Sequence, residues 1–87
     1  SKAVAANAVY PERDLEGGKQ GVALIPFIID ETGKIVDVKA LDNKRATKDM
    51  QKAAELAVKK VAKLIPAKQG GKPVRIQYSI PVTFRIQ

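Results

Sequence analysis

Residues 74–86 carry an unbroken alternation of apolar and polar side chains. The apolar members are Val74, Ile76, Tyr78, Ile80, Val82, Phe84 and Ile86. A strict period of two predicts one extended strand with a buried face and a wet face. At about 3.3 Å per residue this strand would span roughly 40 Å, whereas strands usually have about 5 to 6 residues. The other extended runs, 22–30 and 35–41, are shorter, so we expect part of its backbone edge to stay open. Such an edge needs protection or accepts a strand from another protein.

The composition excludes several classes of function. The chain has 87 residues, which fits one domain, and it contains neither cysteine nor histidine. Disulfides, thiol nucleophiles and the commonest metal ligands are therefore absent. We expect no catalytic residue, no metal ion and no cofactor, and we interpret Ser79 as a residue of the wet strand face. No apolar run approaches the roughly 20 residues that a membrane helix requires.

The first half of the chain predicts a helical turn followed by a hairpin. Pro11 precedes charged residues and is typical of the first position of a short helix. The run 22–30 predicts a strand, and Gly33 supplies the positive φ that a tight connection requires. The run 35–41 then predicts an antiparallel partner strand, with a bulge near residues 36–37 where its alternation fails.

The second half predicts a helix that leads into the long strand. Residues 48–65 have an apolar stripe at helical spacing, Thr47 is a suitable N-cap, and Pro66 ends the pattern. The order of elements predicts an α+β fold: a two-layer unit in which a three-stranded antiparallel sheet packs on one long helix, with a short N-terminal helical turn. We expect residues 1–9 to be a flexible arm or an artificial boundary, and residues 10–87 to form the domain.

The formal charge of +7 leaves two interpretations open. It is compatible with nucleic-acid binding, and equally with a solvated basic surface that prevents self-association. RNA-binding sheets carry exposed aromatic residues on which bases stack. Here Tyr78 and Phe84 share the parity of the aliphatic core residues, which favours the solvated surface. A basic nucleic-acid-binding module is kept as an alternative function.

Several motifs in order along the chain resemble the C-terminal domain of TonB. They are Tyr10-Pro11, the segment 21–38 around Glu31-Thr32-Gly33-Lys34, the loop Pro66-Ala67-Lys68-Gln69-Gly70-Gly71-Lys72-Pro73-Val74, and the ending Tyr78-Ser79-Ile80-Pro81-Val82-Thr83-Phe84. The resemblance covers residues 10–87, and the ending is most similar to versions from Bacteroides-type bacteria. The chain departs from the family at Leu64, where an aromatic residue is usual. Pro26 is also unusual and indicates that part of the first strand is an edge or is bent.

The resemblance implies a non-enzymatic energy transducer. A TonB protein has an inner-membrane helix, a proline-rich spacer and this periplasmic domain, which binds the TonB-box peptide of outer-membrane transporters by strand addition and couples proton-motive force to uptake. The implied partners are these transporters and, through an N-terminal region, the inner-membrane motor proteins; nucleic acid is not among them. Separately from the resemblance, the long strands with apolar residues on both faces are compatible with a homodimer, and the sequence leaves the oligomeric state open. The implied location is the periplasm, with an inner-membrane anchor in the full-length protein. The same fold within a membrane signalling protein is a further alternative.

The long strand itself indicates where a partner would bind. Backbone groups of residues with the same parity point to the same edge, so Pro81 removes a donor only from the edge that the odd-numbered residues serve. One edge must pair with the protein's own sheet, and the other is available to an added strand. The predicted partner-binding residues are Arg75, Gln77, Ser79, Thr83 and Arg85.

Overall fold

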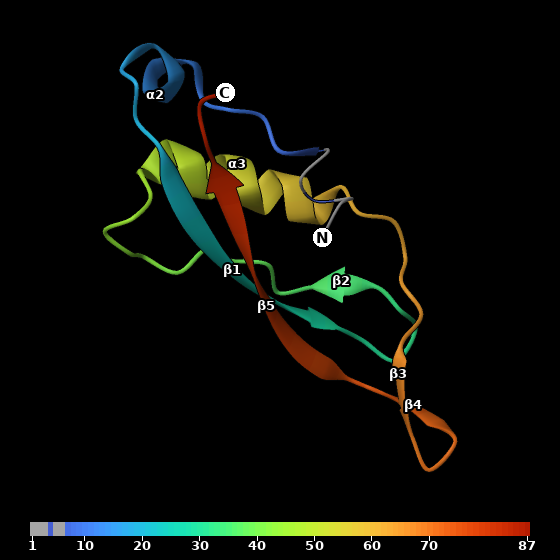
Figure 1. Cartoon of the computed structure of the whole chain (residues 1–87). Coiled ribbons are helices and arrows are strands. Elements are labelled where there is room, and N and C mark those ends of the chain that lie inside the picture. The colour runs from blue at the N-terminus through green and yellow to red at the C-terminus, as the bar shows by residue number, and fades with distance from the viewer. Residues whose placement is uncertain (1–3, 5–6) are drawn as a thin grey trace.

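One central strand organises the molecule. The computed structural model describes Val4 and residues 7–87. Its elements are α2 (Glu12–Glu16), β1 (Gly21–Ile29), β2 (Ile35–Val36), α3 (Lys48–Lys59), β3 (Ala67–Gln69), β4 (Lys72–Val74) and β5 (Ile76–Phe84). β1 lies between β2 and β5 in a three-stranded antiparallel sheet, and α3 crosses one face of this sheet (Figure 1). The predicted α+β class is confirmed.

β5 pairs with β1 over its full length. The register runs from Gly21 opposite Phe84 to Ile29 opposite Ile76. The predicted strand 74–86 was too long, because Val74 belongs to β4 and pairs with Ala67 in a separate two-stranded hairpin. The period of two continues through both strands, so the alternation of side chains does not reveal the boundary between β4 and β5. β5 has an open edge because it is an edge strand, and not because it outgrows its partner.

The second strand is shorter than the predicted range 35–41. β2 stops at Val36 because Asp37 adopts a φ of 55°, in the left-handed region. The chain then returns to the side of β1, where the Lys39 amide donates to the Pro26 carbonyl at 3.3 Å. Pro26 has no N–H to offer on this side, and it lies where the pairing between β1 and β2 has already ended. The bulge predicted near residues 36–37 is not observed: the strand ends there, at the left-handed Asp37.

α3 begins where the capping chemistry predicts. The Thr47 side chain accepts a hydrogen bond from the Met50 amide at 3.1 Å, which satisfies one of the unpaired donors of the first turn. The helix ends at Lys59, before the predicted Ile65. Beyond it the chain turns to the β1–β2 hairpin, where the Leu64 amide donates to the Gly33 carbonyl at 2.8 Å.

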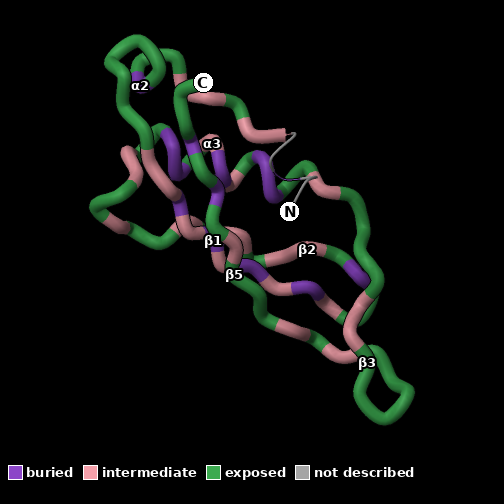
Figure 2. Tube along the Cα trace, in the orientation of Figure 1, coloured by how far each residue is buried: buried purple, intermediate pink, exposed green. Residues whose placement is uncertain are grey.

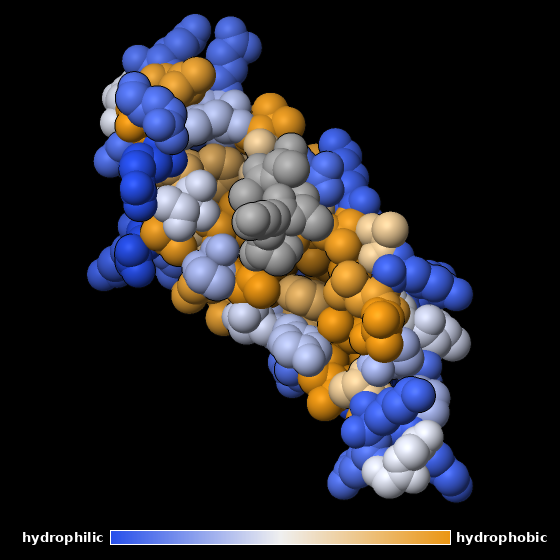
Figure 3. Space-filling view, turned by 45° about the vertical axis from the view of Figure 1, so that its right-hand side comes forward, coloured by the Kyte–Doolittle hydropathy of each residue, from blue (hydrophilic) through white to orange (hydrophobic). Residues whose placement is uncertain are grey.

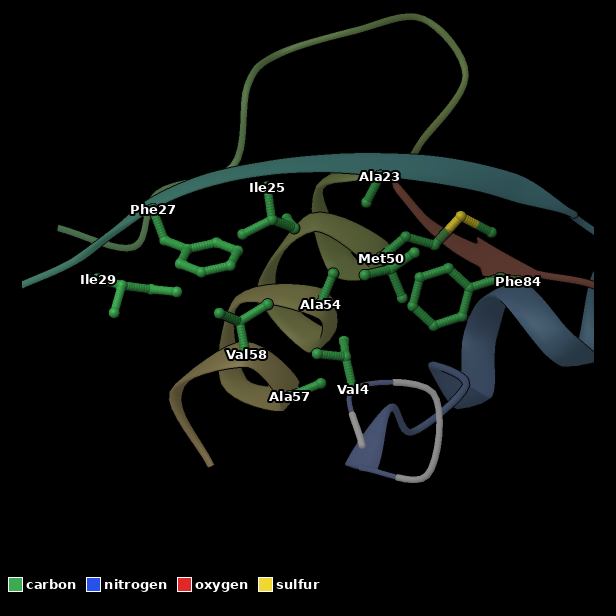
Figure 4. Close-up of a cluster of buried hydrophobic side chains, with 11 residues drawn as sticks. Val4, Ala23, Ile25, Phe27, Ile29, Met50, Ala54, Ala57, Val58 and Phe84 are labelled. Atoms are coloured by element: carbon green, nitrogen blue, oxygen red, sulfur yellow. The ribbon is translucent and has the colours of Figure 1, made fainter. Parts of the chain in front are cut away.

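The core lies between α3 and one face of the sheet (Figures 2 and 4). Ile25, Met50 and Val58 are its largest fully buried side chains. Alanines at positions 23, 54 and 57 are also fully buried, and their small size allows the helix to approach the sheet closely. Phe84 closes the core at one end, where its ring meets the edge of Tyr10 with 5.5 Å between centroids.

The molecule is elongated, with principal extents of 49 × 22 × 16 Å. The β3–β4 hairpin lies at one end and α2 at the other (Figure 1). The expected arm 1–9 falls partly on residues outside the described ones; of this segment the structure describes Val4, which is buried, and residues 7–9. The domain boundary at Tyr10 stays a prediction. Among the described residues, no helix is both long and apolar enough to cross a membrane.

Candidate functional site

The hydrogen bonds of β1 establish which edge of the sheet is free. The Val22 amide donates to the Arg45 carbonyl at 2.8 Å, and the Leu24 carbonyl accepts from the Leu41 amide at 2.9 Å. Both groups of a residue in an antiparallel strand point to the same edge. The backbone N–H and C=O groups of the even-numbered residues of β1 therefore point to the β2 side, and those of its odd-numbered residues point to β5.

The same reasoning extends to β5. Ala23 lies opposite Val82 and Ile25 opposite Ile80, so the even-numbered residues of β5 direct their backbone groups to β1. Its odd-numbered residues direct theirs away from the sheet, and no strand in the described part of the chain pairs with them. We call this row of backbone groups the outer edge. It consists of Gln77, Ser79, Pro81, Thr83 and, just beyond the strand, Arg85.

The structure brings four of the five predicted binding residues together. Gln77, Ser79 and Thr83 are exposed along β5, and Arg85 is exposed directly after its last residue. Their side chains share the sheet face opposite α3, since their partners in the register, Ile28, Pro26 and Val22, alternate with the buried residues of β1. These side chains would flank an added strand on one face.

Arg75 is placed differently. It lies between β4 and β5, and its guanidinium reaches the carboxylates of Glu31 at 4.0 Å and Asp37 at 3.9 Å. All three side chains are more than half exposed, so these ion pairs contribute little stability. Arg75 is therefore engaged by the β1–β2 hairpin and lies at the margin of the outer edge.

Asp30 holds the turn of this hairpin in place. Its carboxylate accepts from the Thr32 hydroxyl at 2.7 Å, the Thr32 amide at 2.9 Å and the Lys34 amide at 2.9 Å. The hydrogen bond from the Thr32 side chain, followed by that from the Lys34 amide, lowers the pKa of Asp30 below its ordinary value. The carboxylate has a structural role in the turn and is remote from the outer edge residues 79–85.

A groove follows the C-terminal half of the outer edge. It has a volume of about 310 Å³, and its lining residues are Val4, Ala8, Tyr10 and residues 81–85. Tyr10 is fixed there by its ring contact with Phe84 and by a hydrogen bond from its hydroxyl to the Lys19 carbonyl. Side chains of a strand added to β5 on the α3 side would enter this groove.

The strand pattern alone did not identify the groove residues that lie outside β5. Ala8 and Tyr10 lie in a segment without helical or strand periodicity, far from β5 in the sequence. The one signal was Tyr10-Pro11, which indicated the start of a helix and said nothing of a distant strand.

In the view of Figure 3, hydrophobic residues form a band along the middle of the molecule, and hydrophilic residues gather at its two ends.

The chemical groups along the outer edge are those of the backbone and of neutral or basic side chains. No group of three or more acidic, histidine or cysteine side chains in the part of the chain that the structure describes could hold a metal ion. What the outer edge offers is a row of backbone donors and acceptors beside a groove lined by both polar and apolar residues, and a free edge of this kind binds peptides in other sheets.

The sequence matches the family of the Gram-negative bacterial TonB protein C-terminal domain over residues 6–86. The chain belongs to this family. TonB C-terminal domains are periplasmic, associated with transport and without enzymatic activity, and in general they interact with outer-membrane receptors. No curated protein matches the chain.

Solved structures of TonB C-terminal domains have the same fold. Two solution structures of the Helicobacter pylori domain are 25% and 26% identical to this chain, with TM-scores of 0.75 and 0.79. The first comparison covers 95% of this chain and 85% of the other, and the second covers 99% and 76%. The TonB2 protein of Vibrio anguillarum is 33% identical over 92% of this chain and 74% of its own, with a TM-score of 0.66.

Proposed function

We propose that this TonB C-terminal domain binds the TonB-box peptide of outer-membrane transporters by adding it as a fourth strand to the outer edge of β5. The observation that carries the proposal is the free edge itself, in which Gln77, Ser79 and Thr83 each turn an N–H and a C=O away from the sheet, toward no strand of the described residues. Membership of the TonB family supports the identity of the peptide. In the full-length protein this contact would couple the inner-membrane proton-motive force to uptake.

The chemistry of strand addition determines which residues matter. Affinity comes mainly from main-chain hydrogen bonds, and side chains beside the added strand supply selectivity. The side chains of Gln77, Ser79, Thr83 and Arg85 would line one face of the added peptide, and the groove beside Tyr10 would receive side chains on the other face. Arg75, held by Glu31 and Asp37, would contact only a peptide that extends beyond β5.

A matched pair of variants at one position tests the proposal. Ser79→Pro removes a donor from the outer edge without touching the ladder to β1, whereas Ser79→Ala keeps the N–H and removes only the hydroxyl. With a synthetic TonB-box peptide, we expect Ser79→Pro to weaken binding more than about tenfold and Ser79→Ala to change it less than about threefold, since one neutral hydrogen bond contributes about 0.5–1.5 kcal/mol and proline also clashes with the incoming strand. Isothermal titration measures both affinities.

Backbone amide shifts locate the peptide independently. The proposal requires the largest perturbations at residues 77–85 and at Tyr10. Perturbations concentrated on α3 (Lys48–Lys59) with β5 unaffected would rule out the outer edge as the docking site. The amide spectrum of Ser79→Pro without peptide serves as the folding control, because its β1 signals should stay in place.

A further inference from the structure

We propose that Pro81 selects the kind of strand that the outer edge accepts: it disfavours pairing with a second copy of the domain and leaves the edge available to a single peptide. The inference rests on the proposed function in one respect, namely that the outer edge is the docking edge. It goes beyond that function by assigning a specificity-determining residue and the partner that this residue rejects.

Pro81 lies at the midpoint of the outer edge. Two residues with a free N–H precede it, Gln77 and Ser79, and two follow it, Thr83 and Arg85. Its ring removes the N–H and leaves the carbonyl as an acceptor. Pro81 is exposed and lies opposite Leu24 in β1, so the core does not require a ring at this position. Its main effect is on the hydrogen-bonding capacity of the outer edge.

The missing N–H of Pro81 would weaken pairing between the outer edges of two copies more than it weakens binding of a peptide. Two copies that pair antiparallel with full overlap of their outer edges place Pro81 opposite the Pro81 of the second copy, because the residue is at the midpoint. Opposed residues that face each other this way normally exchange two hydrogen bonds. Two prolines exchange none, and two carbonyls are left without donors. A shifted register that avoids both prolines overlaps over only two outer-edge residues.

Binding of a peptide loses only one hydrogen bond, where pairing of two copies loses two. Its own strand brings its N–H groups, so only the single donor of Pro81 is missing and the Pro81 carbonyl is still satisfied. Natural sheet proteins place proline on edge strands to prevent edge-to-edge association. The opposite side of the sheet offers no comparable surface among the described strands, because β2 has two residues and ends at the left-handed Asp37. The outer edge is thus where protection is needed.

Restoring the donor tests the inference. Pro81→Val gives the outer edge an unbroken row of N–H groups, and Ser79→Val is the matched control, which adds the same side chain to the same face without a new donor. Sedimentation equilibrium of the isolated domain, up to millimolar concentration and without peptide, measures self-association. We expect Pro81→Val to strengthen it by about tenfold or more, since two hydrogen bonds are regained, and to strengthen binding of the TonB-box peptide by only about threefold, since one is regained.

Three results would overturn the inference: no gain in self-association for Pro81→Val, an equal gain for Ser79→Val, or a wild-type dimer whose β5 amides are protected from exchange. Pro81→Ala repeats the test with a smaller side chain, and an unchanged amide spectrum for β1 shows that the variants are folded. Failure of the wild-type domain to bind the peptide would count against the proposed function alone, because self-association is measured in its absence.

Discussion

At the scale of single residues, two glycines with positive φ allow the cost of a left-handed backbone to be distinguished from the cost of a steric clash. Gly33 has a φ of 86°, and a Cβ placed on it would lie 1.8 Å from the Leu64 carbonyl oxygen; Gly70 has a φ of 59° and nothing within 4 Å of such an atom. Both alanine variants bear the cost of a left-handed residue, about 1–2 kcal/mol. Only Gly33→Ala must also displace backbone.

We therefore expect Gly33→Ala to lower the free energy of unfolding by about 3 kcal/mol or more, and Gly70→Ala by about 1 kcal/mol. Urea unfolding followed by circular dichroism gives both values. Equal losses would mean that the backbone at Leu64 moves away from the added methyl group of Gly33→Ala at no measurable cost in free energy.

Residues with a local chemical role could be predicted from the sequence. Gly33 in the turn, Thr47 at the helix start and the tendency of Pro81 to interrupt one edge all follow from backbone conformation or from a missing donor. Contacts between distant residues have no such signature. Nothing near Asp14 in the sequence indicates that its carboxylate is buried against the Thr47 hydroxyl at 2.7 Å, and nothing near Tyr10 indicates that it faces β5.

At the scale of elements, α3 depends on a cap that serves two segments. The Thr47 hydroxyl donates to Asp14 in α2 at 2.7 Å and accepts from the Met50 amide at 3.1 Å. Thr47→Ala removes the cap, which alone costs about 1 kcal/mol, and leaves the carboxylate of Asp14, a residue that is 3% exposed, without this donor. We expect a total loss of about 2–3 kcal/mol, measured by urea unfolding. Thr47→Ser keeps the hydroxyl and should lose less than about 1 kcal/mol; similar losses for the two variants would show that the hydroxyl is dispensable.

The types of the elements could be predicted better than their ends. Apolar spacing distinguishes helix from strand over most of the chain, but an end is determined by what the next segment contacts. The helical pattern continues to Ile65, yet Ile65 is 90% exposed, because residues after Lys60 leave the sheet to reach Gly33. The alternation of residues 74–86 likewise crosses from β4 to β5 without a break. Parity assigns the backbone groups of the long strand to two edges, but the register with β1 was needed to show which edge is free, and the groove beside it likewise required the fold.

At the scale of the whole molecule, β1 and β5 run along the long direction of an elongated body (Figure 1). A strand added to the outer edge would lie parallel to them. A pull on such a peptide along its own length would load its hydrogen bonds in shear, so that they share the force. A pull across the strand would break them one after another.

The alignment of β5 with the long axis thus makes the proposed contact mechanically directional. A peptide held by a few modest hydrogen bonds would resist tension along the strand far better than its affinity alone suggests. Force spectroscopy with the peptide attached through either of two linkers, one along the strand and one perpendicular to it, should give the higher rupture force for the first geometry. Equal rupture forces would mean that the peptide is held by a pocket, whose grip does not depend on the direction of pull.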